Sequence, residues 1–192
     1  MGEHLLSVFV ALPFAAALLI ALIPRTSQAA HRFVAGTTTA AAFAFLIGLV
    51  FGGFDPSQGG LQFAESTSWI PRFQVNWALG MDGLALVLLL LSALIHFLAV
   101  IATKPRIEGS KGYYALLLLL FGGVNGVFLA TDLFLFYVFW ELMLIPMYFL
   151  IGIWGGEQRK RAATKFILYT LFGSVLMLVA VVAVYLRSGA DG

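Results

Sequence analysis

Residues 131–156 read TDLFLFYVFWELMLIPMYFLIGIWGG, and between residues 133 and 156 the one charged side chain is that of Glu141. A helix of about 20 apolar residues crosses the roughly 30 Å of hydrocarbon in a bilayer. A charged side chain near the bilayer centre costs about 2.5–3.5 kcal/mol on insertion scales, so it usually faces a bundle interior and marks an ion pathway. Glu141 is therefore the first candidate functional residue, as a member of a proton relay.

Two features of the same stretch concern the surroundings of this acid. Asp132 lies nine residues before Glu141, so a helix starting there places the carboxyl roughly 13 Å from its end, near the midplane. Pro146 lacks an N–H and crowds the carbonyl of Leu142, so we expect a bend one turn beyond the acid. A protonated acid hydrogen-bonded inside a helix bundle is the structural alternative to a relay.

The composition indicates a polytopic membrane protein. Of the 192 residues, 61% are hydrophobic and 10% are charged, and the mean hydropathy is +1.00, whereas soluble domains are roughly 45–50% apolar. The net charge of +2 is spread over short loops, so no nucleic-acid partner is expected. The absence of cysteine excludes disulfides, iron–sulfur clusters and thiolate metal sites from this sequence. It contains no nucleotide-binding glycine motif.

Six membrane spans are predicted from the lengths of the apolar runs. They cover residues 5–23, 33–53, 83–103, 113–130, 132–153 and 161–186. The last three follow one another closely, so they are expected to pack as antiparallel neighbours around Glu141. A signal peptide is the alternative for the first run, but this run begins with Glu3 and His4 and is longer than a signal core, so we predict a retained span.

The distribution of lysine and arginine predicts the orientation. Three alternate loops hold Arg25, Arg32, Lys104, Arg106, Lys111, Arg159, Lys160 and Arg161. The opposite side holds Arg72 and Arg187 together with Asp55, Glu65, Asp82, Asp132 and Asp191. We therefore expect the amino terminus outside and the basic loops in the cytoplasm.

The outer loop at residues 54–82 differs from the rest of the chain. Its alternating residues, interrupted at Ile70 and Pro71, suggest a short hairpin on the membrane surface, with Trp69 and Trp77 in the interfacial aromatic belt. Asp82 is placed to cap the next helix. The sequence therefore divides into helices at 1–53, this loop at 54–82, a helix and cytoplasmic loop at 83–112, and helices at 113–192.

Other polar residues in the spans are weaker candidates. Lys165 is a second relay candidate, although its long side chain could instead reach back to water. His96 has no second ligand at helical spacing, so hydrogen-bonded packing is favoured over a relay and a metal site is not expected. Gly122 and Gly126 predict close helix packing, and Asn125 between them either bonds across helices or contacts a water path.

Several of these stretches together resemble one family. They are LFLFYVFWELMLIPMYFLIGIWGG at 133–156, ATKFILYTLFGS at 163–174 and WALGMDGLALVLLLLSAL at 77–94. The sequence closely resembles the chain M (subunit 4) family of proton-translocating NADH:quinone oxidoreductase, respiratory complex I, and its photosynthetic relatives. The resemblance extends over essentially all 192 residues in order.

This resemblance implies an all-α membrane protein and an antiporter-like subunit without redox centres of its own. NADH or ferredoxin, quinone, flavin and iron–sulfur clusters are then expected in partner subunits, which comprise other membrane subunits and a redox arm. The membrane would be a bacterial plasma membrane or a thylakoid membrane. Glu141 matches the family's fifth-helix glutamate, which works with a lysine on the seventh helix. Lys165 matches a sixth-helix position, not that lysine.

The length differs from the family pattern. The family fold has about fourteen helices with two inverted five-helix repeats, whereas this sequence predicts six helices and the first three of the first repeat. We therefore expect either a fragment of a longer protein or a split subunit completed by another chain. Inverted repeats place their site at the repeat interface, so transport is expected to require the missing helices.

Three functions remain open from the sequence. The leading one is a proton-translocating membrane subunit of an NADH- or ferredoxin-linked quinone oxidoreductase. The second is a subunit of an Mrp-type cation/proton antiporter or of a membrane hydrogenase. The third is a membrane scaffold that carries no protons.

Overall fold

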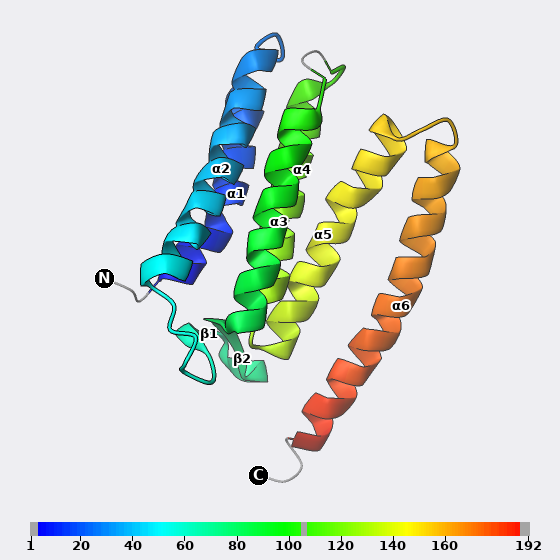
Figure 1. Cartoon of the computed structure of the whole chain (residues 1–192). Helices are drawn as coiled ribbons and strands as arrows, with labels where there is room; N and C mark the ends of the chain where they lie inside the picture. Colours follow the sequence, from blue (N-terminus) through cyan, green and yellow to red (C-terminus); the bar gives the residue numbers. More distant parts are fainter. Residues whose placement is uncertain (1–3, 105–106, 189–192) are drawn as a thin grey trace.

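The computed structural model describes residues 4–104 and 107–188. Arg106 and Asp191, which were used to predict the orientation, and Glu3, which was used against a signal peptide, lie outside the described residues. Within these ranges the chain forms six long apolar helices, side by side in Figure 1. The helices are α1 (Leu5–Leu22), α2 (Gln28–Gly52), α3 (Gly83–Ala102), α4 (Ser110–Leu129), α5 (Leu133–Trp154) and α6 (Arg159–Ser188). The predicted all-α membrane fold is confirmed, with one two-stranded hairpin added to it.

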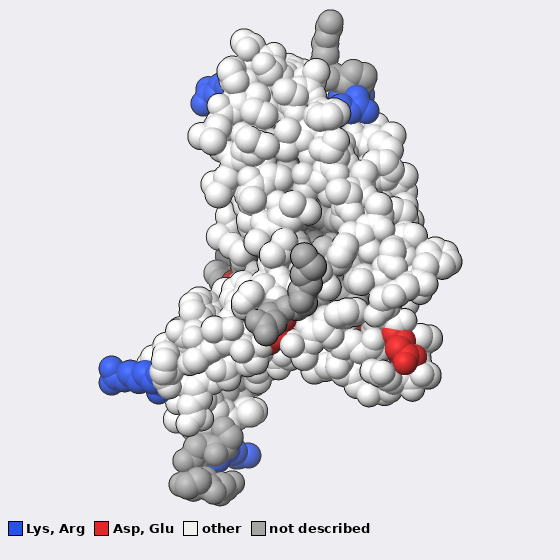
Figure 2. Space-filling view, turned by 90° about the vertical axis from the view of Figure 1, so that its left-hand side faces the viewer, with Lys and Arg blue, Asp and Glu red and all other residues white. Residues whose placement is uncertain are grey.

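Three helices begin earlier than the sequence predicted. Helix α2 starts at Gln28, α4 at Ser110 and α6 at Arg159. Each helix begins in the polar residues before its apolar run, because these residues also form helical backbone hydrogen bonds. Most of the basic residues assigned to loops therefore lie in first helical turns. We call this end of the bundle the basic end. Its described basic residues are Arg25, Arg32, Lys104, Lys111, Arg159, Lys160 and Arg161. Figure 2 shows a broad uncharged surface with charged side chains toward its ends.

The opposite end, called the hairpin end, carries strands β1 (Gln62–Ile70) and β2 (Val75–Met81). The strands are antiparallel, with irregular register near each end of β1. Pro71 starts a short 3-10 turn between them, at the break that the sequence predicted. The hairpin packs against the ends of α1, α3, α4 and α5. Asp82 then caps α3, as expected, because its Oδ1 accepts a 2.7 Å hydrogen bond from the backbone N–H of Ala85.

Helix α4 lies at the centre of the bundle and packs against α1, α2, α3 and α5. A Cβ atom at Gly122 would lie 2.7 Å from Cε2 of Phe14, and one at Gly126 would overlap the ring of Phe139. The two glycines therefore allow α1 and α5 to approach α4 closely, as their spacing predicted.

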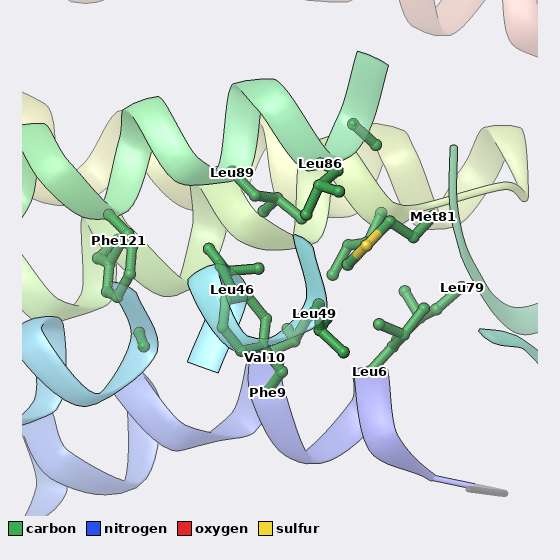
Figure 3. Close-up of a cluster of buried hydrophobic side chains, with 14 of the residues drawn as sticks. Leu6, Phe9, Val10, Leu46, Leu49, Leu79, Met81, Leu86, Leu89 and Phe121 are labelled. Atoms are coloured by element: carbon green, nitrogen blue, oxygen red, sulfur yellow. The ribbon is translucent and has the colours of Figure 1, made fainter. Parts of the chain in front are cut away.

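The main apolar core lies toward the hairpin end. Figure 3 shows its side chains meeting from α1, α2, α3, α4 and β2. They include Leu6, Val10, Leu46, Leu79, Met81, Leu89 and Phe121, all almost fully buried. Helix α6 stands at the edge of the bundle in Figure 1 and packs mainly on α5. Helix α5 therefore lies between the well-packed core and the edge helix α6.

Candidate functional site

The position of Glu141 is set by the start of α5. Asp132 caps this helix, because its Oδ1 accepts hydrogen bonds from the N–H groups of Phe134 (2.9 Å) and Leu135 (3.0 Å). Its other carboxylate oxygen accepts a 3.2 Å hydrogen bond from the N–H of Asn76 in β2. The hairpin and α5 are thus fixed to each other. Glu141 follows nine residues later, roughly 13 Å along the helix, and α5 continues without interruption through Pro146.

The Glu141 carboxyl group is only partly satisfied. The side chain is half-buried, and its Oε1 is fully enclosed with no hydrogen-bond partner among the described residues. An enclosed acceptor without a partner costs about 1–3 kcal/mol, and more when it is charged. Buried groups of this kind are rare in native proteins and call for a functional explanation or an unseen water.

Two hydroxyl groups adjoin this carboxyl. Tyr137 lies one turn before Glu141 on α5, and its side chain interacts with both Glu141 and Ser174 of α6. Ser174 is one of the few buried residues of α6, and its hydroxyl donates a 3.0 Å hydrogen bond to the carbonyl of Leu171. The three side chains of Glu141, Tyr137 and Ser174 therefore form one polar cluster at the α5–α6 interface, which we call the α5–α6 cluster.

A groove of about 310 Å³ adjoins this cluster. Its lining residues come from α5 and α6, and they are Trp140, Tyr169, Thr170, Gly173, Ser174 and Met177. The groove shares Ser174 with the α5–α6 cluster and includes the neighbour of Glu141, Trp140. It offers space for water or for another helix beside the acid.

The structure does not bring Lys165 to Glu141. Lys165 is exposed on α6. A Cβ at Gly152 would lie 3.5 Å from Cβ of Ala163, which aligns the start of α6 with the end of α5. Because the helices are antiparallel, Lys165 is level with a point about nine residues from Glu141, roughly 13 Å away along the axis. This separation is too long for a direct ion pair between the two side chains.

The remaining candidates lie elsewhere in the bundle. Nδ1 of His96 is 2.8 Å from the carbonyl oxygen of Ser92, and its ring lies 4.8 Å from that of Phe121, so the histidine has the packed, hydrogen-bonded arrangement that was favoured. Asn125 is fully buried on α4. Both of its amide atoms lack a partner among the described residues, so the expected bond across helices is not found there.

Glu65, which the sequence identifies only as a charge in the outer loop, is a buried structural acid. Its Oε1 accepts a 2.6 Å hydrogen bond from the N–H of Leu6, and its Oε2 accepts from the N–H (3.1 Å) and hydroxyl (2.6 Å) of Ser7. The sequence offered one sign of this role. Helix α1 has no side-chain cap at its N-cap residue, His4, so its first N–H groups need an acceptor from elsewhere in the chain. Both carboxylate oxygens of Glu65 therefore have partners, whereas Oε1 of Glu141 has none among the described residues.

Comparisons with known proteins bear on the family. The model of a family described as "NADH:quinone oxidoreductase/Mrp antiporter, TM" matches residues 130–191. NAD(P)H-quinone oxidoreductase chain 4-1 of Synechocystis sp. is 41% identical over 175 residues, which are 91% of this chain and 33% of that protein. NADH-quinone oxidoreductase subunit M of Rhodobacter capsulatus is 41% identical over 191 residues, covering 97% of this chain and 37% of that one. The chain belongs to the antiporter-like chain 4 (subunit M) family.

Solved structures agree with this family membership. A chain of respiratory complex I from Thermus thermophilus with bound NADH matches with a TM-score of 0.80 and 34% identity, over 96% of this chain and 36% of that chain. The Mrp complex from Dietzia sp. matches with a TM-score of 0.76 at 24% identity, over 96% of this chain and 20% of that chain, which shows a shared fold. The resemblance and fold class expected from the sequence are confirmed. This chain spans about a third of the length of its curated relatives.

Proposed function

We propose that this chain acts as a proton-translocating membrane subunit, of the chain 4 or M type, in a quinone oxidoreductase supplied by NADH or ferredoxin. The observation that carries the proposal is the enclosed and unpartnered Oε1 of Glu141 at the α5–α6 interface. Structural acids in this fold can be satisfied by neighbouring N–H and hydroxyl groups, as Glu65 is. The Oε1 atom of Glu141 has no such partner among the described residues, which suits a group that gains and loses a proton.

The chemistry of the α5–α6 cluster follows from the cost of an isolated charge. An enclosed carboxylate without a counter-charge costs several kcal/mol, so a charged group at this position would need a cation or a chain of water molecules nearby. The hydroxyls of Tyr137 and Ser174 can each accept and donate a proton. Water in the adjoining groove would connect them to Glu141. Lys165 is proposed as a further relay member nearer the basic end, linked through water because it lies too far for direct contact.

The working environment of the chain is proposed from its charges and family. Basic residues favour the cytoplasmic side, so the basic end would face the cytoplasm or stroma and the hairpin end the outside. The membrane would be a bacterial plasma membrane or a thylakoid membrane. Other membrane subunits and a redox arm with flavin and iron–sulfur clusters would supply the driving reaction. The helices that complete the site would come from the remaining two thirds of a chain 4 protein or from a separate chain.

The test is the Glu141→Gln substitution in the complete assembly. Glutamine keeps the shape of the side chain and cannot release a proton, so we expect most of the proton movement coupled to quinone reduction to be lost. The measurement is protons taken up per electron in sealed vesicles. Glu157→Gln is the matched control, because Glu157 is exposed in the α5–α6 loop. Unchanged coupling in Glu141→Gln would leave only the scaffold function.

An Mrp-type antiporter or membrane hydrogenase subunit is the second candidate, because the matching family model covers both oxidoreductase and Mrp chains. These assemblies differ in their partners. Purification of the tagged assembly with flavin- and iron–sulfur-containing chains supports the oxidoreductase. Purification with other antiporter chains and no redox chain supports the Mrp type.

A further inference from the structure

The basic end of the bundle contains a second buried polar set, on α2 and α4, away from Glu141. Nδ1 of His31 on α2 lies 3.1 Å from the hydroxyl oxygen of Ser110 on α4. His31 is 0% exposed and Tyr114, one turn after Ser110, is 1% exposed. Gln28 lies one turn before His31 at the start of α2. Four polar side chains therefore lie in the first two turns of α2 and α4, where the two helices pack together.

Three atoms of this set have no partner. Oε1 of Gln28, Nε2 of His31 and the hydroxyl of Tyr114 are each enclosed without a hydrogen bond to any described residue. Enclosed polar atoms in native proteins are nearly always satisfied, by protein groups or by ordered water. Three such atoms in one region therefore each need a hydrogen-bond partner that the described side chains do not supply.

The direction of the helices favours an approach of these atoms to one another. Both α2 and α4 begin at the basic end, so they run parallel and the His31–Ser110 contact fixes their relative height. Helical side chains lean toward the amino-terminal end, which favours an approach of Tyr114, one turn after Ser110, to the level of His31. In agreement, Tyr114 belongs to the same buried cluster as Ala35, which lies one turn after His31 on α2.

The surroundings determine what the site can hold. On the side toward the membrane centre it is closed by an apolar cluster that includes Ala35, Leu117 and Leu118. A metal cation is disfavoured because no carboxylate belongs to the set. An amide oxygen, an imidazole nitrogen and a hydroxyl together need a neutral ligand that both donates and accepts hydrogen bonds, and water is the smallest such ligand.

We propose that Gln28, His31 and Tyr114 enclose an ordered water site at the basic end of the bundle. The water bonds to Nε2 of His31 and to the Tyr114 hydroxyl, and the amide oxygen of Gln28 accepts a hydrogen bond from it or from a second water. His31 is thereby in contact with water although its side chain is fully enclosed by protein. The proposal concerns α2 and α4 and is independent of the role of Glu141.

The direct test is a cryo-electron microscopy map of the complete assembly, at a resolution that shows waters elsewhere between the helices. We expect a density peak within hydrogen-bonding distance of both Nε2 of His31 and the Tyr114 hydroxyl, and its loss in Tyr114→Phe. A direct His31–Tyr114 hydrogen bond, or no peak at this place, overturns the proposal.

A stability comparison gives a second, independent readout. Tyr113 is the matched control for its neighbour, because its hydroxyl has a defined partner, Oγ1 of Thr103 at 3.0 Å. Removing a satisfied hydroxyl destabilises a protein, whereas removing an enclosed and unsatisfied one stabilises it. We therefore expect Tyr114→Phe and Tyr113→Phe to lower the melting temperature of the assembly by similar amounts. A higher melting temperature in Tyr114→Phe means that the site is dry and overturns the proposal.

Discussion

The carboxylate of Glu65 accepts a 2.6 Å hydrogen bond from the hydroxyl of Ser7, so a residue of the hairpin caps the first helix. The first N–H groups of any helix lack partners within it, and those of Leu6 and Ser7 donate to the same carboxylate. Trp77 of β2 strengthens the contact, because its Nε1–H donates a 2.8 Å hydrogen bond to the Ser7 hydroxyl. The hairpin therefore holds α1 in place instead of merely resting on the membrane surface.

Replacement of this acid tests its role. Glu65→Gln retains the size of the side chain but removes the charge and one of the two accepting oxygens. Hydrogen bonds to a charged group contribute about 1.5–3 kcal/mol, so we expect the stability to fall by about 2 kcal/mol, measured by thermal unfolding in detergent. Glu108→Gln, an exposed acid at the basic end, is the control. Equal melting temperatures for the two variants would contradict this role.

Asp132 links the hairpin to the helix that carries Glu141. We expect Asp132→Ala to lower the stability by about 1–2 kcal/mol, because the α5 cap and the bond to Asn76 are both lost. Asp132→Asn retains a capping oxygen, so its loss should be smaller. Thermal unfolding of the two variants measures the difference. If alanine and asparagine behave alike, the cap does not fix the start of α5.

Close packing of α4 against α5 depends on Gly126, because glycine has no side chain. We expect Gly126→Ala to destabilise the protein by about 1–3 kcal/mol, because its Cβ would overlap the Phe139 ring and force a shift. Gly48→Ala in α2 is the control, since its Cβ would meet nothing within 4 Å, and the helix propensity of alanine favours it by about 1 kcal/mol. Unfolding in denaturant should therefore shift in opposite directions for the two variants.

The fold could be predicted from the sequence wherever one local property decides the structure. The length of an apolar run predicts which segments span a membrane. An acid directly before such a run predicts the N-cap of the helix, as at Asp82 and Asp132. The helix starts were wrong by a few residues because hydrogen bonding, unlike hydropathy, continues through polar residues such as His31. The hairpin was predictable from its alternation, but its contact with α1 was not, because Glu65 and Ser7 are 58 residues apart.

The candidate site was predictable only in part, for a related reason. A single carboxyl in an apolar span identifies Glu141, since its cost in lipid is large. The direction in which it points could not be predicted, because the residues around α5 are apolar on every side. The approach of Tyr137 to Ser174 depends on the register between α5 and α6, which no pattern within either helix determines.

This register makes Tyr137 a testable member of the proposed proton path. Tyr137→Phe removes the hydroxyl that interacts with both Glu141 and Ser174 and leaves the ring. A hydrogen bond is worth about 1 kcal/mol, so we expect proton uptake at a fixed rate of electron transfer to slow about fivefold in vesicles containing the complete assembly. Tyr169→Phe is the matched control, because Tyr169 also lines the groove but is 79% exposed. If both variants pump at the same rate, protons reach Glu141 without the Tyr137 hydroxyl, and the groove itself must carry the water chain.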